Sequence, residues 1–92
     1  MAERQGIEGN ELDGVFFTEK SAPAGTAVIK DIDLIVRFRQ NLNLTEMKKR
    51  AAQEIKACGA NALVDMKYGQ RAKIGLFSNG EQWYIQGKAV RL

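Results

Sequence analysis

The side chains of this 92-residue chain that could do chemistry are one thiol, several carboxylates, and cations interleaved with aromatic rings. Histidine is absent, so one chain can build neither the common zinc ligand sets nor a histidine-activated nucleophile. Lysine or carboxylate bases remain, but no local motif places one beside a nucleophile. Gly69, Gly75 and Gly80 do not match a phosphate-binding loop. We therefore predict a protein that is not an enzyme and has no catalytic, metal-binding or cofactor-binding residues.

The thiol and one pair of carboxylates have both a functional and a structural interpretation. Cys58 is the only cysteine and cannot form an internal disulfide. It could be a redox sensor or a metal ligand shared between subunits, but it falls on an apolar helix stripe, where free cysteines usually pack. Asp31 and Asp33 could hold a cation together, although solvated carboxylates on a strand are commoner. We expect packing for the thiol and solvation for the carboxylates.

The cations and aromatic rings form a candidate interaction surface. Basic side chains could hold the phosphates of a single-stranded nucleic acid while aromatic rings stack on its bases. No RNP-like, KH or helix-turn-helix pattern accompanies them, so an ordinary charged surface is the simpler interpretation. The residues assigned to this surface are Arg37, Arg39, Lys49, Lys56, Lys67, Trp83 and Tyr84.

The clearest element is a helix over about residues 43–58. Asn43 is a good N-cap, and Glu46 three positions later is typical of a capping box. Gly59 predicts a left-handed residue that ends the helix, and a strand follows over residues 60–69. The apolar residues that recur at spacings of three and four, and so share one stripe, are Leu44, Met47, Ala51, Ile55 and Cys58.

The remaining elements are predicted to be strands. A short edge strand is expected over residues 15–18, and the alternation over residues 28–39 favours a half-buried strand over a helix through 30–40. Asn79-Gly80 predicts a two-residue hairpin turn, which would pair Leu76 with Trp83 and Ile74 with Ile85. The rhythm slips after Ile85, so Gly87 is a candidate bulge.

Residues 1–13 show neither periodicity, so we predict a flexible arm there, followed by a single domain over residues 14–92. One domain of this size buries only a modest core, and a partner subunit would add to it. No apolar run approaches the length of a membrane span, and the first residues lack the pattern of a signal peptide. We expect a cytoplasmic protein.

Two motifs carry a resemblance to a known family. Gly59-Ala60-Asn61-Ala62, followed by a hydrophobic strand, and the closing stretch over residues 86–92 together resemble the YbjQ-like family of small bacterial proteins. The match covers the C-terminal half of the chain. The resemblance implies a β-α-β-β unit with a dodecin-like subunit fold, joined through short strands into a ring that is typically a pentamer. That family also carries a heavy-metal-binding label, but no ligand transfers to this chain, which lacks histidine and has Cys58 on its core stripe.

Together these observations predict an α+β fold in two layers, with the helix packed on an antiparallel sheet and an extra short N-terminal strand. The expected function is a non-enzymatic module that assembles with copies of itself. Two alternatives stay open: a binder of a small ligand or anion at subunit interfaces, and a basic protein that binds single-stranded nucleic acid.

Overall fold

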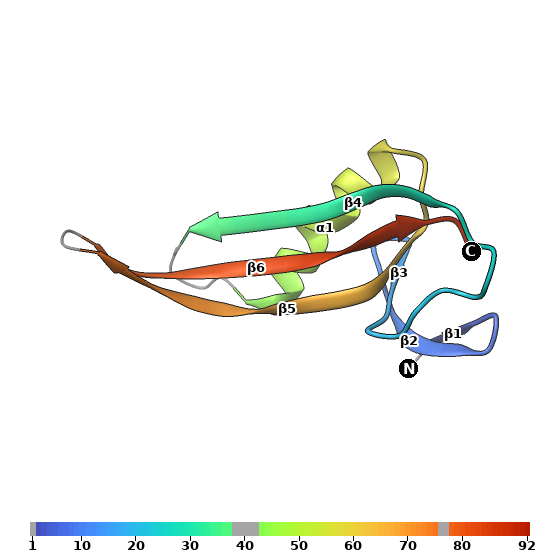
Figure 1. Cartoon of the computed structure of the whole chain (residues 1–92), viewed down its shortest axis with the longest axis horizontal. Coiled ribbons are helices and arrows are strands. Elements are labelled where there is room, and N and C mark those ends of the chain that lie inside the picture. The colour runs from blue at the N-terminus through green and yellow to red at the C-terminus, as the bar shows by residue number, and fades with distance from the viewer. Residues whose placement is uncertain (1, 38–42, 76–77) are drawn as a thin grey trace.

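The computed structural model describes residues 2–37, 43–75 and 78–92. These residues form an α+β fold in which one helix packs on a sheet, as predicted (Figure 1). The central unit is β-α-β-β, also as predicted, and the described helix is too short and too polar to cross a membrane. In chain order the elements are β1 (Ala2–Arg4), β2 (Ile7–Leu12), β3 (Val15–Phe17), β4 (Val28–Arg37), α1 (Leu44–Ala57), β5 (Ala62–Gly75) and β6 (Ser78–Val90).

The sheet has the strand order β1-β2-β3-β5-β6-β4. Neighbouring strands are antiparallel, except for β3 and β5, which are parallel. The sheet is therefore mixed, whereas the sequence predicted an antiparallel sheet. Residues 18–27 carry the chain from β3 to β4, which lies at the far edge of the sheet. The predicted strand over residues 28–39 is confirmed as β4 up to Arg37.

The first thirteen residues contain two strands that the sequence patterns did not indicate. Two-residue turns connect β1 to β2 and β2 to β3, and all four turn residues have positive φ, as in type I′ hairpins. The second turn is Asp13-Gly14, a recognised hairpin signal. Ile7 in β2 is buried and anchors the segment. The segment is therefore structured as strands, and its flexibility stays a prediction.

The predicted turn at Asn79-Gly80 is wrong. These residues lie in β6, where Asn79 pairs with Ile74, and Trp83 pairs with Gln70. The predicted partner Leu76 lies outside the described residues. The observed register places residues 62–64 opposite residues 88–90, where most of their side chains are buried. That burial outweighs the local turn preference of an Asn-Gly pair.

A bulge interrupts the β5–β6 ladder opposite Gly87, the residue that the sequence rhythm indicated, but β6 itself keeps its alternation and the bulged strand is β5. Asp65 and Met66 of β5 both face Gly87 of β6, so the extra residue is on β5. A Cβ atom at Gly87 would lie 2.8 Å from the carbonyl oxygen of Val64 and 2.9 Å from the side chain of Leu63. The close approach of the two strands therefore requires glycine at this position.

Replacing Gly87 with alanine should lower the free energy of unfolding by about 1–3 kcal/mol, because the new methyl group must push the strands apart. Urea denaturation followed by circular dichroism measures the change. The control is Lys88→Ala. Lys88 follows Gly87 in β6 and its side chain is exposed, so this change should affect stability little. Equal stability of the Gly87→Ala variant and the wild-type protein would contradict this account of the bulge.

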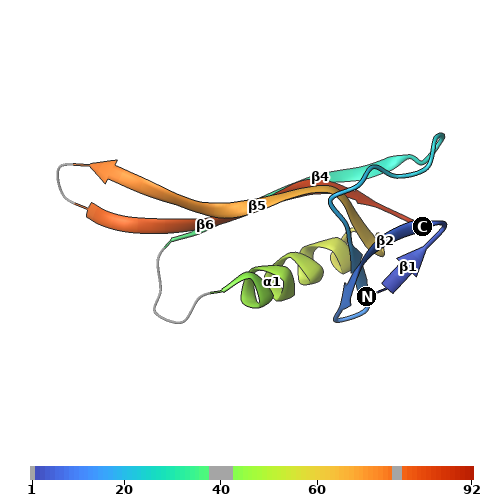
Figure 2. The same cartoon turned by 90° about the horizontal axis from the view of Figure 1, so that it is seen from below.

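Helix α1 covers one face of the sheet (Figure 2). The Asn43 Oδ1 accepts a hydrogen bond of 3.0 Å from the Glu46 N–H, which confirms the N-cap. Gly59 has a φ of +86°, and the Ala60 N–H donates to the Ile55 carbonyl at 3.0 Å, so the helix ends in a Schellman motif as expected. The buried residues of the helix are Met47, Ala51 and Ile55 from the predicted stripe, and Ala52.

The opposite face of the sheet is only partly covered. A second apolar cluster, with Phe16, Val64 and Val90 at its centre, lies beneath the segment 18–27, whose Ala22 packs against it. Farther along, the same face carries Ile35, which is 50% exposed. Among the described side chains, this face of the sheet is therefore covered at one end and exposed around Ile35.

Candidate functional site

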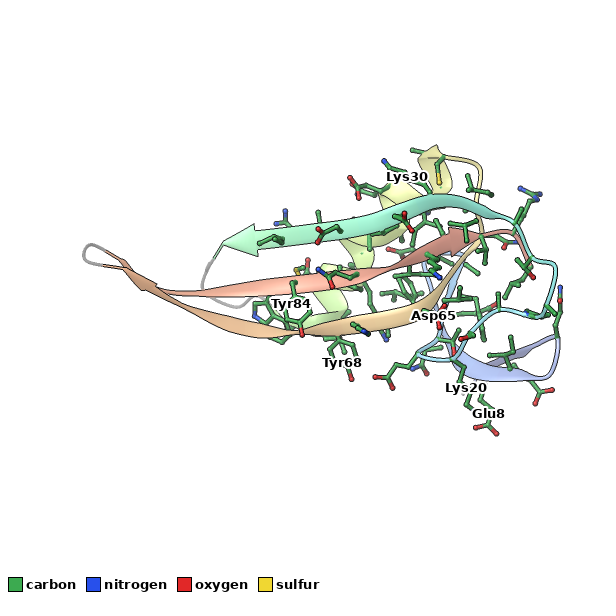
Figure 3. All side chains as sticks on the ribbon, viewed as in Figure 1. Glu8, Lys20, Lys30, Asp65, Tyr68 and Tyr84 are labelled. Atoms are coloured by element: carbon green, nitrogen blue, oxygen red, sulfur yellow. The ribbon has the colours of Figure 1, made fainter. Side chains whose placement is uncertain are left out.

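A partly open hollow of about 320 Å³ lies between β2, the segment after β3, α1 and β5. Its apolar lining comes from Phe17, Leu44 and Met66, with the ring of Tyr68 at one side. Its polar lining includes the side chains of Glu8, Glu19, Lys20 and Lys48. We call this the Lys48 hollow. Figure 3 shows Glu8 and Lys20 projecting on the same side of the molecule as Tyr68.

Backbone hydrogen bonds at the β5 bulge hold one wall of the hollow in place. The Met66 N–H donates to the Thr18 carbonyl at 3.0 Å, and the Asp65 N–H donates to the Lys20 carbonyl at 2.9 Å. Thr18 is buried, and its hydroxyl donates to the Glu8 carbonyl at 2.8 Å. These bonds tie β2, the segment after β3 and β5 together, so the bulge positions the residues of the site.

Lys48 reaches the hollow from α1. Its Nζ atom lies 5.5 Å from the centroid of the Phe17 ring, within the range of a cation–π contact. Partial burial lowers the pKa of Lys48, because it removes water from the charged form, and the nearby Glu19 carboxylate opposes that shift. Among the described residues, no carboxylate forms an ion pair with this ammonium group.

The lowered pKa of Lys48 predicts how stability depends on pH. Because the unfolded chain binds this proton more tightly than the folded chain does, stability is lowest below the folded pKa. It should rise as the pH increases from the folded pKa to the ordinary lysine value. Lys48→Met should therefore be slightly more stable than the wild-type protein at neutral pH and lose the alkaline rise.

Urea midpoints measured from neutral to alkaline pH test this prediction. Lys49→Met is the matched control, because the same charge is removed from an exposed side chain. The Lys49 Nζ atom lies 3.8 Å from the Glu46 carboxylate. An alkaline rise that persists in the Lys48→Met variant would show that another group causes it.

The structure separates the residues assigned to the candidate nucleic-acid surface. Lys49 and Lys56 are exposed on α1, whereas Lys67 and Tyr84 lie on the sheet face that points away from the helix. Trp83 is partly buried against the core under the helix. Arg37 is the last residue of β4, and Arg39 lies outside the described residues. The side chains of the other five residues, Lys49, Lys56, Lys67, Trp83 and Tyr84, therefore do not all lie on one surface.

Cys58, Asp31 and Asp33 were also considered as functional residues from the sequence. The Cys58 Sγ lies 3.2 Å from the Ile55 carbonyl oxygen and packs partly buried against the core. Asp33 accepts a hydrogen bond of 3.1 Å from Gln86 on the open sheet face. Asp31 and Asp33 line a broad, shallow depression there, and no group of three or more potential metal ligands occurs within the described ranges.

The Gly59–Ala62 motif has a clear structural role. The Asn61 side chain donates to the Leu92 carbonyl at 3.0 Å and accepts from the Leu92 N–H at 2.8 Å. The Arg91 guanidinium donates to the Gly59 carbonyl at 2.8 Å. The motif therefore joins the turn after the helix to the last residues of the chain.

The sequence patterns did not single out Lys48, although a signal was present. Lys48 follows Met47 directly and so borders the apolar stripe of the helix, where a lysine stem can lie along apolar surface. Phe17, Glu19 and Glu8, which line the same hollow, come from segments whose positions only the tertiary fold defines.

No family model and no curated protein sequence matches this chain. Among solved structures, it is similar to a protein of unknown function from Pediococcus pentosaceus ATCC 25745, described as a member of the DUF74 family. The TM-score is 0.64 at 11% sequence identity, and the alignment covers 87% of this chain and 99% of that one. At this identity the likeness shows the fold alone. The chain therefore shares its α+β fold with a DUF74-family protein whose own function is unknown.

Proposed function

We propose that this protein is a non-enzymatic module that assembles with copies of itself through the open edges of its sheet. The observation that carries the proposal is the length of the β5–β6 hairpin. Within the described residues β4 extends to Arg37, opposite Gln82, whereas the ladder of β5 and β6 continues from the pair Ala72–Glu81 to the pair Gly75–Ser78. We call this projecting part the β5–β6 ribbon.

The ribbon extends past the end of α1 (Figure 2). Within the described residues, no third strand pairs with either of its edges. A two-stranded ribbon is marginally stable in water by itself, and its edges present unpaired backbone N–H and C=O groups. Pairing with a strand of another subunit would satisfy these groups, which supports assembly as the role of the ribbon.

Strand β4 offers a suitable partner edge. It is the last strand of the sheet and pairs only with β6 among the described strands. Three apolar side chains of β4 are about half exposed: Val28 at 47%, Ile29 at 43% and Ile35 at 50%. Contact with a neighbouring subunit would bury these side chains and enlarge a core that is small in a chain of this length.

A ribbon that pairs with the β4 edge of the next subunit would be a head-to-tail contact. Such contacts repeat around a closed ring when the rotation between subunits allows it. The resemblance to the YbjQ-like family favours a ring of this kind, with a pentamer as our specific proposal. We further propose that the protein works in the cytoplasm.

Native mass spectrometry and light scattering at micromolar concentration test the assembly. We expect one main species whose mass is a multiple of the 10.2 kDa chain, and five copies would support the pentamer. A mass of 10.2 kDa throughout the micromolar range would refute self-assembly.

A further inference from the structure

We propose that the Lys48 hollow binds a small organic carboxylate that carries a single negative charge and an apolar body. This proposal does not depend on assembly, because every residue of the hollow belongs to one subunit.

The position of Lys48 indicates the negative group of the ligand. Its ammonium group is partly buried and lies over the Phe17 ring, with no ion-pair partner among the described residues. Partial burial removes some of its water, and the nearby Glu19 carboxylate, which is not within ion-pair distance, offsets that loss only in part. A carboxylate placed beside it would restore the lost hydrogen bonds, since an ammonium group has three donors.

The apolar lining indicates the rest of the ligand. Phe17, Leu44 and Met66 face the hollow, and Tyr68 is 39% exposed beside them. At about 320 Å³ the hollow can hold a molecule with one aromatic ring or a short aliphatic chain. Such a body would also cover the exposed face of the Tyr68 ring.

The remaining charges restrict the ligand to one negative charge. Glu8 and Glu19 balance Lys20 and Lys48 around the hollow, so the lining has no net positive charge. A second negative charge on the ligand would face these carboxylates without a further cation to offset it. A phosphate monoester should therefore bind more weakly than a carboxylate of the same body.

Titration of the isotopically labelled full-length protein with phenylacetate, followed by amide NMR spectra, tests the proposal. We expect saturable shifts at the amides of Thr18, Lys48 and Met66. Phenylacetamide, which is neutral but nearly the same shape, should bind at least about tenfold more weakly because it lacks the charge-assisted hydrogen bond. Phenyl phosphate should also bind at least about tenfold more weakly, because its second negative charge faces Glu8 and Glu19.

Two variants separate binding in the hollow from general attraction to a basic protein. Lys48→Gln should weaken phenylacetate binding by about tenfold or more, whereas Lys49→Gln removes the same charge from the next residue and should not. The dispersion of the amide spectrum verifies that each variant is folded. Equal affinity of phenylacetate and phenylacetamide, equal effects of the two variants, or tighter binding of phenyl phosphate would overturn the proposal.

Discussion

Replacement of residues 72–81 by Asn-Gly is expected to convert the proposed assembly into a folded monomer. The variant removes the ribbon beyond the pair Arg71–Gln82, which is the last one in the ladder that also borders β4. This pair lies four residues along each strand from Gly75–Ser78, so it has the same place in the alternating hydrogen-bond pattern. A two-residue type I′ turn can therefore close the shortened hairpin without changing its register.

Three measurements distinguish loss of assembly from loss of the fold. Light scattering should report the mass of one chain, and the far-ultraviolet circular dichroism should still show helix α1. The midpoint of thermal unfolding should no longer depend on protein concentration, because folding is then unimolecular. Lys56→Gln, on the exposed face of α1, is the control and should leave the mass of the assembly unchanged. A shortened variant that keeps the full mass would show that the ribbon is not the subunit contact.

The helix and its two ends could be predicted because local residues determine them. The cap at Asn43 involves an amide three residues away, and the stop at Gly59 depends on bonds to carbonyls of the preceding turn. The buried stripe follows from the helical period alone. Strand β4 was predictable for a similar reason, since an alternating pattern suffices when one face of a strand is buried.

The register of the β5–β6 hairpin could not be predicted from its turn signal. Asn79-Gly80 and Asp13-Gly14 are equally good local signals, but only the second forms a turn in the structure. The difference is tertiary, because pairing of residues 62–64 with residues 88–90 buries apolar side chains that the Asn79-Gly80 register would leave without partners.

The candidate site could not be predicted from the sequence either, because tertiary contacts bring its residues together. Lys48 lies far in the sequence from Phe17 and Glu8, and the three line one hollow, one wall of which is held by the hydrogen bonds between the β5 bulge and the segment after β3. The cationic or aromatic type of a residue does not indicate where it lies in the fold. Residues selected by type alone, such as Lys49, Lys67 and Trp83, are therefore found on different parts of the fold.

Substitution of alanine for Ile55 should cause a large loss of stability for a single change on α1. Ile55 is fully buried at 0% exposure, within the cluster that joins α1 to the sheet. Truncation of a buried isoleucine removes its packing and leaves a cavity, which costs about 2–5 kcal/mol. The total stability of a domain of this size is about 5–15 kcal/mol, so the variant should be close to unfolding at moderate temperature.

Two further variants serve as comparisons for the stability of Ile55→Ala. Ile55→Val removes one methylene group and should cost about 0.5–1.5 kcal/mol, while Gln53→Ala, exposed on the same helix, should stay within about 0.5 kcal/mol of the wild-type protein. All urea transitions must be recorded at one protein concentration, because an assembling chain gains stability from its partners. An Ile55→Ala variant no less stable than Gln53→Ala would mean that the contact of α1 with the sheet does not stabilise the fold. In that case the open sheet face, and not the helix-covered one, would have to hold the subunit together.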